Sequence, residues 1–338
     1  MSRPTLPPPS AELHLHIEGT LEVDLVFQLA ARNGIELPYA DPQELRERYS
    51  FADLQSFLDL YYANMAVLRT EQDFADMTRA YLVRAAAAGV RHAEIMVDPQ
   101  AHLARGVSLA TCIDGIASVL RTSEADHGVS TSLIAAFLRD RPEAEALQVL
   151  DEMLATGAPI IGIGLDSAEV GHPPSGFVTL FERARAAGLR CIAHACEEGP
   201  PSYAWEALDL LHVERIDHGI RCMEDDALVA RLVREQMPLT VCPLSNVRLR
   251  TVDTLAEHPL PRMLAAGLNV SVSSDDPAYF GGYVDDAYRA LVDELGLTDD
   301  DVALLAANSV RSSFVTPERR DALLAEVVRW RHGEPSTA

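Results

Sequence analysis

The chain has 338 residues, 48% of them hydrophobic, and a mean hydropathy close to zero, so it is long enough to bury the core of a globular protein. Its formal net charge of −23 argues against binding to nucleic acid or to an anionic membrane, because both partners need a positively charged surface. No apolar run approaches the roughly 18 residues that a membrane-spanning helix needs.

The cysteines and the start of the chain bear on the cellular compartment. Five cysteines are an odd number, and they lack the short paired spacings of a zinc finger or a disulfide scaffold. Residues 1–4 and the prolines that follow contain no apolar stretch of a secretory signal. We therefore expect free thiols and a cytoplasmic location.

Lysine is absent, since all 28 basic residues are arginine. This excludes chemistry that depends on a lysine side chain, namely a Schiff base, a P-loop or a lysine-derived ligand that bridges two metals.

Short apolar runs rich in β-branched residues alternate along the chain with longer helical patterns. The expected strands are residues 13–17, 92–97, 130–136, 160–165, 190–194, 215–217, 239–241 and 268–272. Helical periodicity lies between most of them, for example in residues 143–155, 178–187, 203–211 and 227–235.

Eight strands with intervening helices predict an α/β protein, specifically a (β/α)8 TIM barrel over residues 10–320 within one domain that spans 1–338. An open doubly wound sheet is the alternative, but no glycine-rich dinucleotide fingerprint follows any expected strand. The connection over about 20–90 is too long for one helix and predicts an inserted helical segment. Its aromatic stripe, which includes Phe57 and Tyr61, is interpreted as core rather than as a ligand-binding wall. Closing helices are expected after about residue 300.

Two histidines lie in the first expected strand, where apolar and polar residues alternate. Because a strand has a side-chain period of two, His14 and His16 point to one face. Two imidazoles on one face near the end of a strand form half of a site for a divalent metal.

Four further polar clusters follow later expected strands. They are residues 194–200, 217–219, 242–246 and 273–277. In a barrel the carboxyl ends of the strands meet at one mouth, which brings His194, His218, Asp275 and Asp276 to the first two histidines. Three histidines and a carboxylate match a catalytic zinc site with an open position for water. Glu197 supplies an additional carboxylate suited to general acid–base catalysis.

The chain resembles the adenosine/adenine deaminase family in five short motifs that occur in the family's order between about residues 10 and 320. They are His14-x-His16, His194-Ala195-x-Glu197, Asp217-His218-Gly219, Cys242-Pro243-x-Ser245-Asn246 and Ser274-Asp275-Asp276-Pro277.

The resemblance implies a barrel that binds one Zn²⁺ per chain and replaces the 6-amino group of a purine with oxygen. It implies zinc ligation by His14, His16, His194 and Asp275. It also implies that Glu197 protonates purine N1, that His218 orients or deprotonates the water, and that Asp276 bonds N7.

Within the family, residues 16–22, 98–100, 165–174 and 276–283 resemble the adenine deaminase branch. The adenosine branch usually has aspartate where Glu18 stands, to hold the ribose 5′-hydroxyl, and a glycine near Ser167. The larger Glu18 and Ser167 side chains imply a free base as substrate. The resemblance thus implies conversion of adenine to hypoxanthine and ammonia.

Two features depart from the family pattern. Cys196 stands where the family has glycine, and only glycine adopts positive φ without strain. Residues 95–97 are aliphatic where adenine deaminases of this type usually carry aromatic residues, which implies a roomier pocket. An N6-substituted adenine and adenosine are therefore alternative substrates.

Two other function classes remain. A binuclear metal hydrolase on the same fold is disfavoured by the absence of lysine. A purine-binding sensor or scaffold would need no free carboxylate such as Glu197 beside the metal. The expected partner is a small purine, and the oligomeric state is left open.

Overall fold

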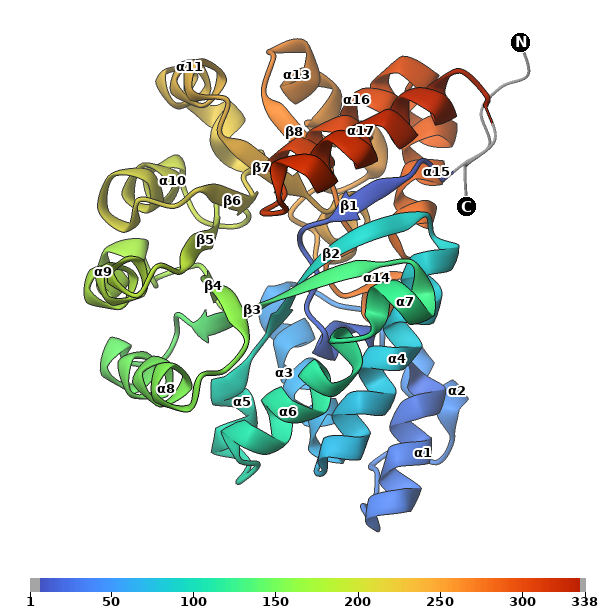
Figure 1. Ribbon diagram of the computed structural model, residues 1–338, viewed down its shortest axis with the longest axis vertical. Helices are drawn as coiled ribbons and strands as arrows, with labels where there is room; N and C mark the ends of the chain where they lie inside the picture. The colour runs from blue at the N-terminus through green and yellow to red at the C-terminus, as the bar shows by residue number, and fades with distance from the viewer. Residues whose placement is uncertain (1–6, 335–338) are drawn as a thin grey trace.

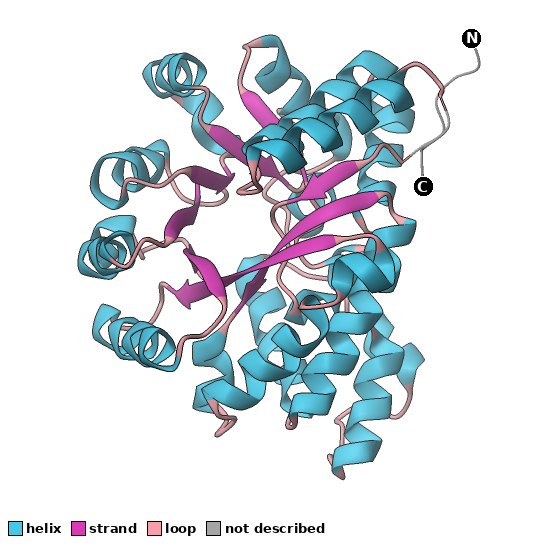
Figure 2. Ribbon diagram, viewed as in Figure 1, coloured by secondary structure: helices cyan, strands magenta, loops and turns pink. Residues whose placement is uncertain are grey.

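The computed structural model describes residues 7–334, which form a nearly closed barrel of parallel strands surrounded by helices (Figures 1 and 2). Within this part of the chain, eight strands neighbour one another in sequence order. They are β1 (Ser10–Glu12), β2 (Val90–Val97), β3 (Ser130–Leu138), β4 (Ile160–Asp166), β5 (Arg190–Ala195), β6 (Arg215–His218), β7 (Pro238–Val241) and β8 (Asn269–Val272). The predicted (β/α)8 fold is confirmed.

Within the described residues, the helices connect the strands and follow the last of them. Between β1 and β2 lie α1 (Val23–Asn33), α2 (Pro42–Glu47), α3 (Leu54–Asn64) and α4 (Glu71–Ala87). Between β2 and β8 lie α5 (Pro99–Ala104), α6 (Leu109–Leu120), α7 (Ser123–His127), α8 (Glu143–Thr156), α9 (Val178–Ala186), α10 (Pro201–Glu206), α11 (Asp226–Glu235), α12 (Pro243–Arg248) and α13 (Leu260–Ala265). After β8 come α14 (Pro277–Phe280), α15 (Val284–Leu295), α16 (Asp299–Ser312) and α17 (Pro317–Arg331).

Local sequence signals set the helix ends. Thr70 and Asp73 form a capping box at the start of α4, and Thr298 and Asp301 form another at the start of α16. Gly157 takes a left-handed conformation that ends α8. The segment predicted as one helix over 203–211 instead changes at Ala207 from α10 into a π-helical turn (Ala207–Leu211).

The first predicted strand is wrong in its bounds, because β1 ends at Glu12 and the two histidines lie beyond it. The hydroxyl of Ser273 accepts hydrogen bonds from the backbone N–H groups of Leu13 and His14, at 3.3 and 3.2 Å, in place of a strand carbonyl. The chain then stays extended through single bridges, from Leu15 to Asp275 and from His16 to Met96. The other predicted strands agree with β2 to β8 to within two residues at each end.

Inside the barrel, apolar side chains pack together beside the buried ion pair of Arg215 and Glu94. Met96, Ile134, Ala136 and Ile192 pack together from β2, β3 and β5. Helices α16 and α17 pack against β1 and the residues that follow it through one buried cluster: Ala11, Leu13, Ala306, Val310, Leu323 and Val327. The carboxyl ends of the strands form the opposite end of the barrel, the mouth, where catalytic residues of this fold gather.

The cytoplasmic location was expected from the cysteines and from the first residues of the chain, and the structure describes only the cysteines. The five cysteines are buried and free. Residues 1–4, on which the expectation about a secretory signal was based, lie outside the described residues. None of the helices within residues 7–334 combines the length and the apolar character that a membrane crossing requires.

Candidate metal centre and active site

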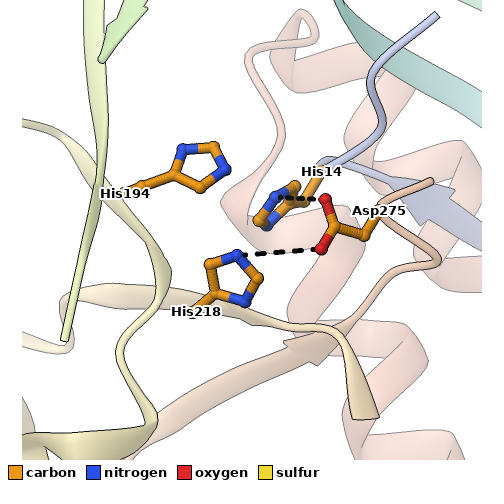
Figure 3. A group of neighbouring side chains, drawn as sticks. All are labelled: His14, His194, His218 and Asp275. Carbon is orange, nitrogen blue, oxygen red and sulfur yellow. Dashed lines mark ion pairs between the residues drawn. The ribbon is translucent and has the colours of Figure 1, made fainter. Parts of the chain in front are cut away.

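Four buried side chains from distant parts of the sequence meet at the mouth: His14, His194, His218 and Asp275 (Figure 3). Each offers one ligand atom, and these atoms all lie within 4.8 Å of one another. The Nε2 atom of His14 is 3.2 Å from Oδ1 of Asp275, and Nε2 of His218 is 3.8 Å from Oδ2 of the same carboxylate.

His16 joins this group on the side of the Asp275 oxygen that also faces His14. Its Nε2 lies 3.3 Å from Nε2 of His194 and 3.6 Å from Oδ1 of Asp275. Oδ1 of Asp275 thus faces His14 and His16, whereas Oδ2 faces His218. The two oxygens of Asp275 therefore separate His218 from His14 and His16.

The donor set fits a divalent cation. Nδ1 of His14 lies 3.2 Å from the Thr240 carbonyl, which makes it the protonated nitrogen and leaves the buried Nε2 without a hydrogen-bond partner. Burial, with the neighbouring imidazoles, lowers the pKa of His194 well below its ordinary value. Burial by itself opposes ionisation of Asp275, but the facing imidazoles bring the pKa of this carboxyl well below its usual range. Neutral imidazoles and an ionised carboxylate are the protonation states that metal ligation requires.

Glu197 and His218 form the candidate acid–base pair. Oε2 of Glu197 is 3.5 Å from Nε2 of His218, and both side chains are buried. Burial, followed by the nearby charge of Asp275, raises the pKa of Glu197 well above its ordinary value. Burial also lowers the pKa of His218 to about 3. Near neutral pH the carboxylic acid can therefore donate a proton and the neutral imidazole can accept one.

The loop that carries Glu197 is held by a residue to which the sequence analysis assigned no role. The buried carboxylate of Glu169 accepts four backbone N–H groups of this loop, at 2.7 to 3.0 Å: those of Cys196, Glu197, Glu198 and Gly199. A fixed backbone restricts where the Glu197 side chain can lie, so Glu169 is a candidate positioning residue.

Backbone strain concentrates at the strand ends that form this site. Positive φ occurs at Ser167 after β4 (72°), Cys196 after β5 (61°), His218 at the end of β6 (62°) and Asp275 after β8 (65°). Each such residue costs on the order of 1–3 kcal/mol, and such costs gather where function requires a particular side-chain direction. Cys196 therefore adopts the conformation that glycine would favour, with its N–H held by Glu169.

Asp276 lies in the pocket beside the metal candidates. Burial, together with the adjacent Asp275, raises the pKa of Asp276 well above its ordinary value. A Cβ atom added to Gly19 would lie 2.0 Å from Oδ1 of Asp276, so the absence of a side chain at Gly19 makes room for this carboxyl group.

One wall of the pocket comes from α3, which lies in the connection between β1 and β2. The pocket-lining residues of this wall are Leu54, Phe57, Leu58, Tyr61 and Tyr62. The interpretation of the aromatic stripe as core alone is wrong, because its residues pack together and also face the pocket. The helical spacing of these residues was visible in the sequence, but the sequence did not show that α3 turns this face towards the barrel mouth.

The two residues taken to exclude a sugar lie in different places. Ser167 lines the pocket, and its hydroxyl accepts a hydrogen bond from the Tyr62 hydroxyl at 3.1 Å. Glu18 is fully buried outside the pocket lining. Its Oε1 is 2.7 Å from Nε2 of His102 and accepts the backbone N–H of Asp98 at 3.1 Å.

Two further aspartates, not proposed as site residues from the sequence, line the pocket. Asp98 follows β2 and Asp166 ends β4, and their carboxyl groups lie beside each other near His16. Burial raises the pKa of both groups well above the ordinary value, and the proximity of the two carboxyl groups raises that of Asp166 further. The sequence did offer a signal for both residues, because each is an acidic residue at the carboxyl end of a predicted strand.

The features that suggested a larger substituent on the purine do not line the pocket. Met96 packs inside the barrel, and Ile95 and Val97 belong to the core outside it. The Cys196 thiol lies 3.5 Å from the Pro200 carbonyl, and Cys196 is likewise not a lining residue.

Known proteins identify the family of the chain. A sequence profile for the family described as adenosine deaminase matches residues 9–330. An adenine deaminase of Streptomyces coelicolor is 61% identical over 98% of this chain and 99% of its own length. The crystal structure of an adenine deaminase from Arthrobacter aurescens matches with a TM-score of 0.96 and 71% identity, over 96% of this chain and 99% of that one. A zinc-bound amidohydrolase from Burkholderia ambifaria matches with a TM-score of 0.89 and 30% identity, over 96% and 91% of the two chains. The chain therefore belongs to the adenosine deaminase family of hydrolytic enzymes.

Proposed function

We propose that this protein is a zinc-dependent adenine deaminase that converts adenine and water to hypoxanthine and ammonia. The observation that carries the proposal is the buried Glu197–His218 pair beside a cluster of histidines and Asp275 that fits a cation. The near full-length relatives from Streptomyces coelicolor and Arthrobacter aurescens, both named adenine deaminase, support the same substrate. The free thiols fit a cytoplasmic enzyme.

We assign the metal to His14, His16, His194 and Asp275. His14 and His16 face one oxygen of Asp275, and His16 and His194 bring their Nε2 atoms within 3.3 Å of each other. His218 faces the other oxygen and also Glu197, which suits a residue that contacts the attacking water. When bound, Zn²⁺ lowers the pKa of a water molecule enough to make it a nucleophile near neutral pH.

The protein's own residues then move the protons. Glu197 donates a proton to purine N1, which makes C6 electrophilic, and His218 takes a proton from the water whose oxygen bonds to C6. Asp276, whose raised pKa favours its neutral form, donates a hydrogen bond to N7. The C6–nitrogen bond then breaks, and the amino group leaves as ammonia with the proton that His218 held. The proton of the new C6 hydroxyl passes to Glu197 as the C6 carbonyl forms, which restores the acid. Hypoxanthine remains.

A substrate comparison tests this function. Metal-replete protein is incubated with adenine, adenosine and N6-isopentenyladenine, and hypoxanthine and ammonia are quantified. We expect kcat/KM for adenine to exceed that for adenosine by at least about tenfold, equivalent to roughly 1.4 kcal/mol of transition-state binding. Preference for adenosine, or for the N6-substituted base, would contradict the assignment.

A further inference from the structure

The acidic pair of Asp98 and Asp166 has no part in the proton transfers described above. Both residues are buried, with 1% and 3% of their surface exposed, and both line the pocket. The Oδ1 atoms of both residues have no hydrogen-bond partner among the described residues. Buried acceptors without partners are costly, so their presence in a pocket points to a ligand that donates hydrogen bonds.

His16 separates this pair from the metal candidates. Its Nδ1 lies 3.5 Å from Oδ2 of Asp166 and 3.8 Å from Oδ1 of Asp98. Its Nε2, on the opposite side of the ring, lies 3.6 Å from Oδ1 of Asp275. The pair therefore occupies the part of the pocket that lies beyond the imidazole from the metal site.

The orientation of a purine follows from the proposed function, on which this inference rests. With N1 at Glu197 and N7 at Asp276, the edge that contains N3 and N9 is left to the remaining polar groups of the lining. Those groups are the Asp98 and Asp166 carboxyls, the Ser167 hydroxyl and the hydroxyls of Tyr61 and Tyr62. A free base carries a proton on its imidazole ring there, whereas a nucleoside carries a sugar.

We propose that Asp98 and Asp166 accept the imidazole N–H of a free purine base and thereby select it against 9-substituted purines. The pair is held in place from outside the pocket, because Glu18 accepts the backbone N–H of Asp98 and the Asp166 carbonyl accepts that of Arg139 at 3.0 Å. Glu18 thus acts on specificity through Asp98. The hydrogen bond between Tyr62 and Ser167 ties α3 to the end of β4 beside the pair, where a sugar would need space.

The test compares adenine with 9-methyladenine, which lacks the N–H, in wild-type protein and in Asp166→Ala, Asp166→Asn and Asp98→Asn. Wild type should favour adenine by at least about 10²-fold in kcat/KM, because a site built around a hydrogen bond rejects a substrate that cannot form it. In Asp166→Ala this ratio should fall to about tenfold or less, mainly through a higher KM for adenine, because the contact is the same in the ground and transition states. The two Asn variants should show the same trend with a smaller change.

Asp140→Asn is the matched control, since Asp140 is an exposed aspartate close enough to act on the Asp98 carboxyl and lies outside the pocket lining. It should keep the wild-type ratio. Equilibrium binding of hypoxanthine and 9-methylhypoxanthine to each variant supplies a readout that is independent of turnover, and it should show the same loss of discrimination.

Three outcomes would overturn the inference while leaving the proposed function in place. The adenine preference could persist unchanged in Asp166→Ala and in both Asn variants. The variants could instead lose the bound metal, which would make the pair a support for His16. Wild type could bind a second metal equivalent that the variants lose, which would make the pair a cation site. Failure of wild type to deaminate adenine would refute the proposed function itself.

Discussion

Buried ionisable groups differ between the two ends of the barrel: those near the amino-terminal end form an ion pair, and those at the mouth have raised pKa values. Towards the amino-terminal end, Arg215 and Glu94 are both fully buried, and Nη1 of Arg215 donates to Oε2 of Glu94 at 2.6 Å. Burial by itself opposes ionisation of Glu94, but the Arg215 charge brings the pKa of Glu94 below its ordinary value. At the mouth, Glu197 and Asp276 are buried and their pKa values are raised. The imidazole that faces Glu197 is that of His218, whose own pKa is lowered by burial, so it supplies no positive charge near neutral pH.

This difference separates stability from function. A buried charge that is paired is satisfied within the protein. Removal of one partner leaves the other charge buried and unpaired, which lowers the free energy of unfolding. Buried acids without such partners are retained at a cost to stability, which a ligand or a reaction must justify. The contrast predicts that substitutions at the mouth change catalysis and that those at the opposite end change stability.

The largest effect is expected from loss of a metal ligand. His16→Ala should be isolated with little metal and with activity near background, since a three-ligand site binds zinc less tightly. His218→Ala should retain the metal and lose about 10²–10⁴-fold in kcat, the usual contribution of a general acid or base. Elemental analysis measures the metal content of each variant, and steady-state kinetics measure its kcat. If His218→Ala lacks metal and His16→Ala keeps it, the two roles are exchanged.

Glu197→Gln should lower kcat by about 10²–10⁴-fold with metal content unchanged. Because the raised pKa keeps Glu197 protonated, wild-type activity should fall as pH rises through that pKa and the acid form is lost. The residual activity of the Gln variant should lack this alkaline decline. Near-normal turnover by metal-replete Glu197→Gln would show that another group protonates N1.

Glu169→Gln should lower kcat by about 10–100-fold, the range typical of residues that orient a catalytic group. One amide oxygen cannot replace both carboxylate oxygens, and the new NH₂ group faces backbone donors. Because Glu197 loses its position rather than its chemistry, the alkaline decline in activity should remain. Glu182→Gln, on an exposed position of α9, is the matched control. Equal kinetics for the two variants would show that Glu169 does not position Glu197.

Glu94→Gln should behave in the opposite manner. It leaves Arg215 buried beside a neutral partner and should reduce the free energy of unfolding by about 3–5 kcal/mol. Activity per folded molecule should change little, because the pair lies away from the mouth. Denaturant unfolding and kinetics at low temperature measure both quantities. A selective loss of kcat at unchanged stability would break the division between the two ends.

Much of this architecture could be predicted from local sequence patterns. Strands β2 to β8 are short apolar runs in which alternation and β-branching determine the backbone, so their bounds followed closely. The end of β1 was not predicted correctly, because it depends on the Ser273 hydroxyl, which is 260 positions from Leu13 in the sequence. Local pattern carries no information about such a partner.

The site was predictable where residue type alone signals chemistry. Histidines and aspartates after strands indicated the metal candidates, which the barrel then brings together. Glu18 was expected to face the substrate, but its partner is His102 on α5. Three further residues could be recognised only in the folded chain. Asp98 and Asp166 are buried with Oδ1 atoms that lack a partner, and Glu169 accepts the backbone N–H groups of a loop that follows another strand.

The most direct test of the central claim is a metal titration. Metal is removed with a chelator, and Zn²⁺ is returned in increments while hypoxanthine formation from adenine is followed. A single centre at the mouth predicts that activity is lost on removal and returns linearly, with a break at about one equivalent per chain. Full activity in metal-free protein, or a break near two equivalents, would contradict it.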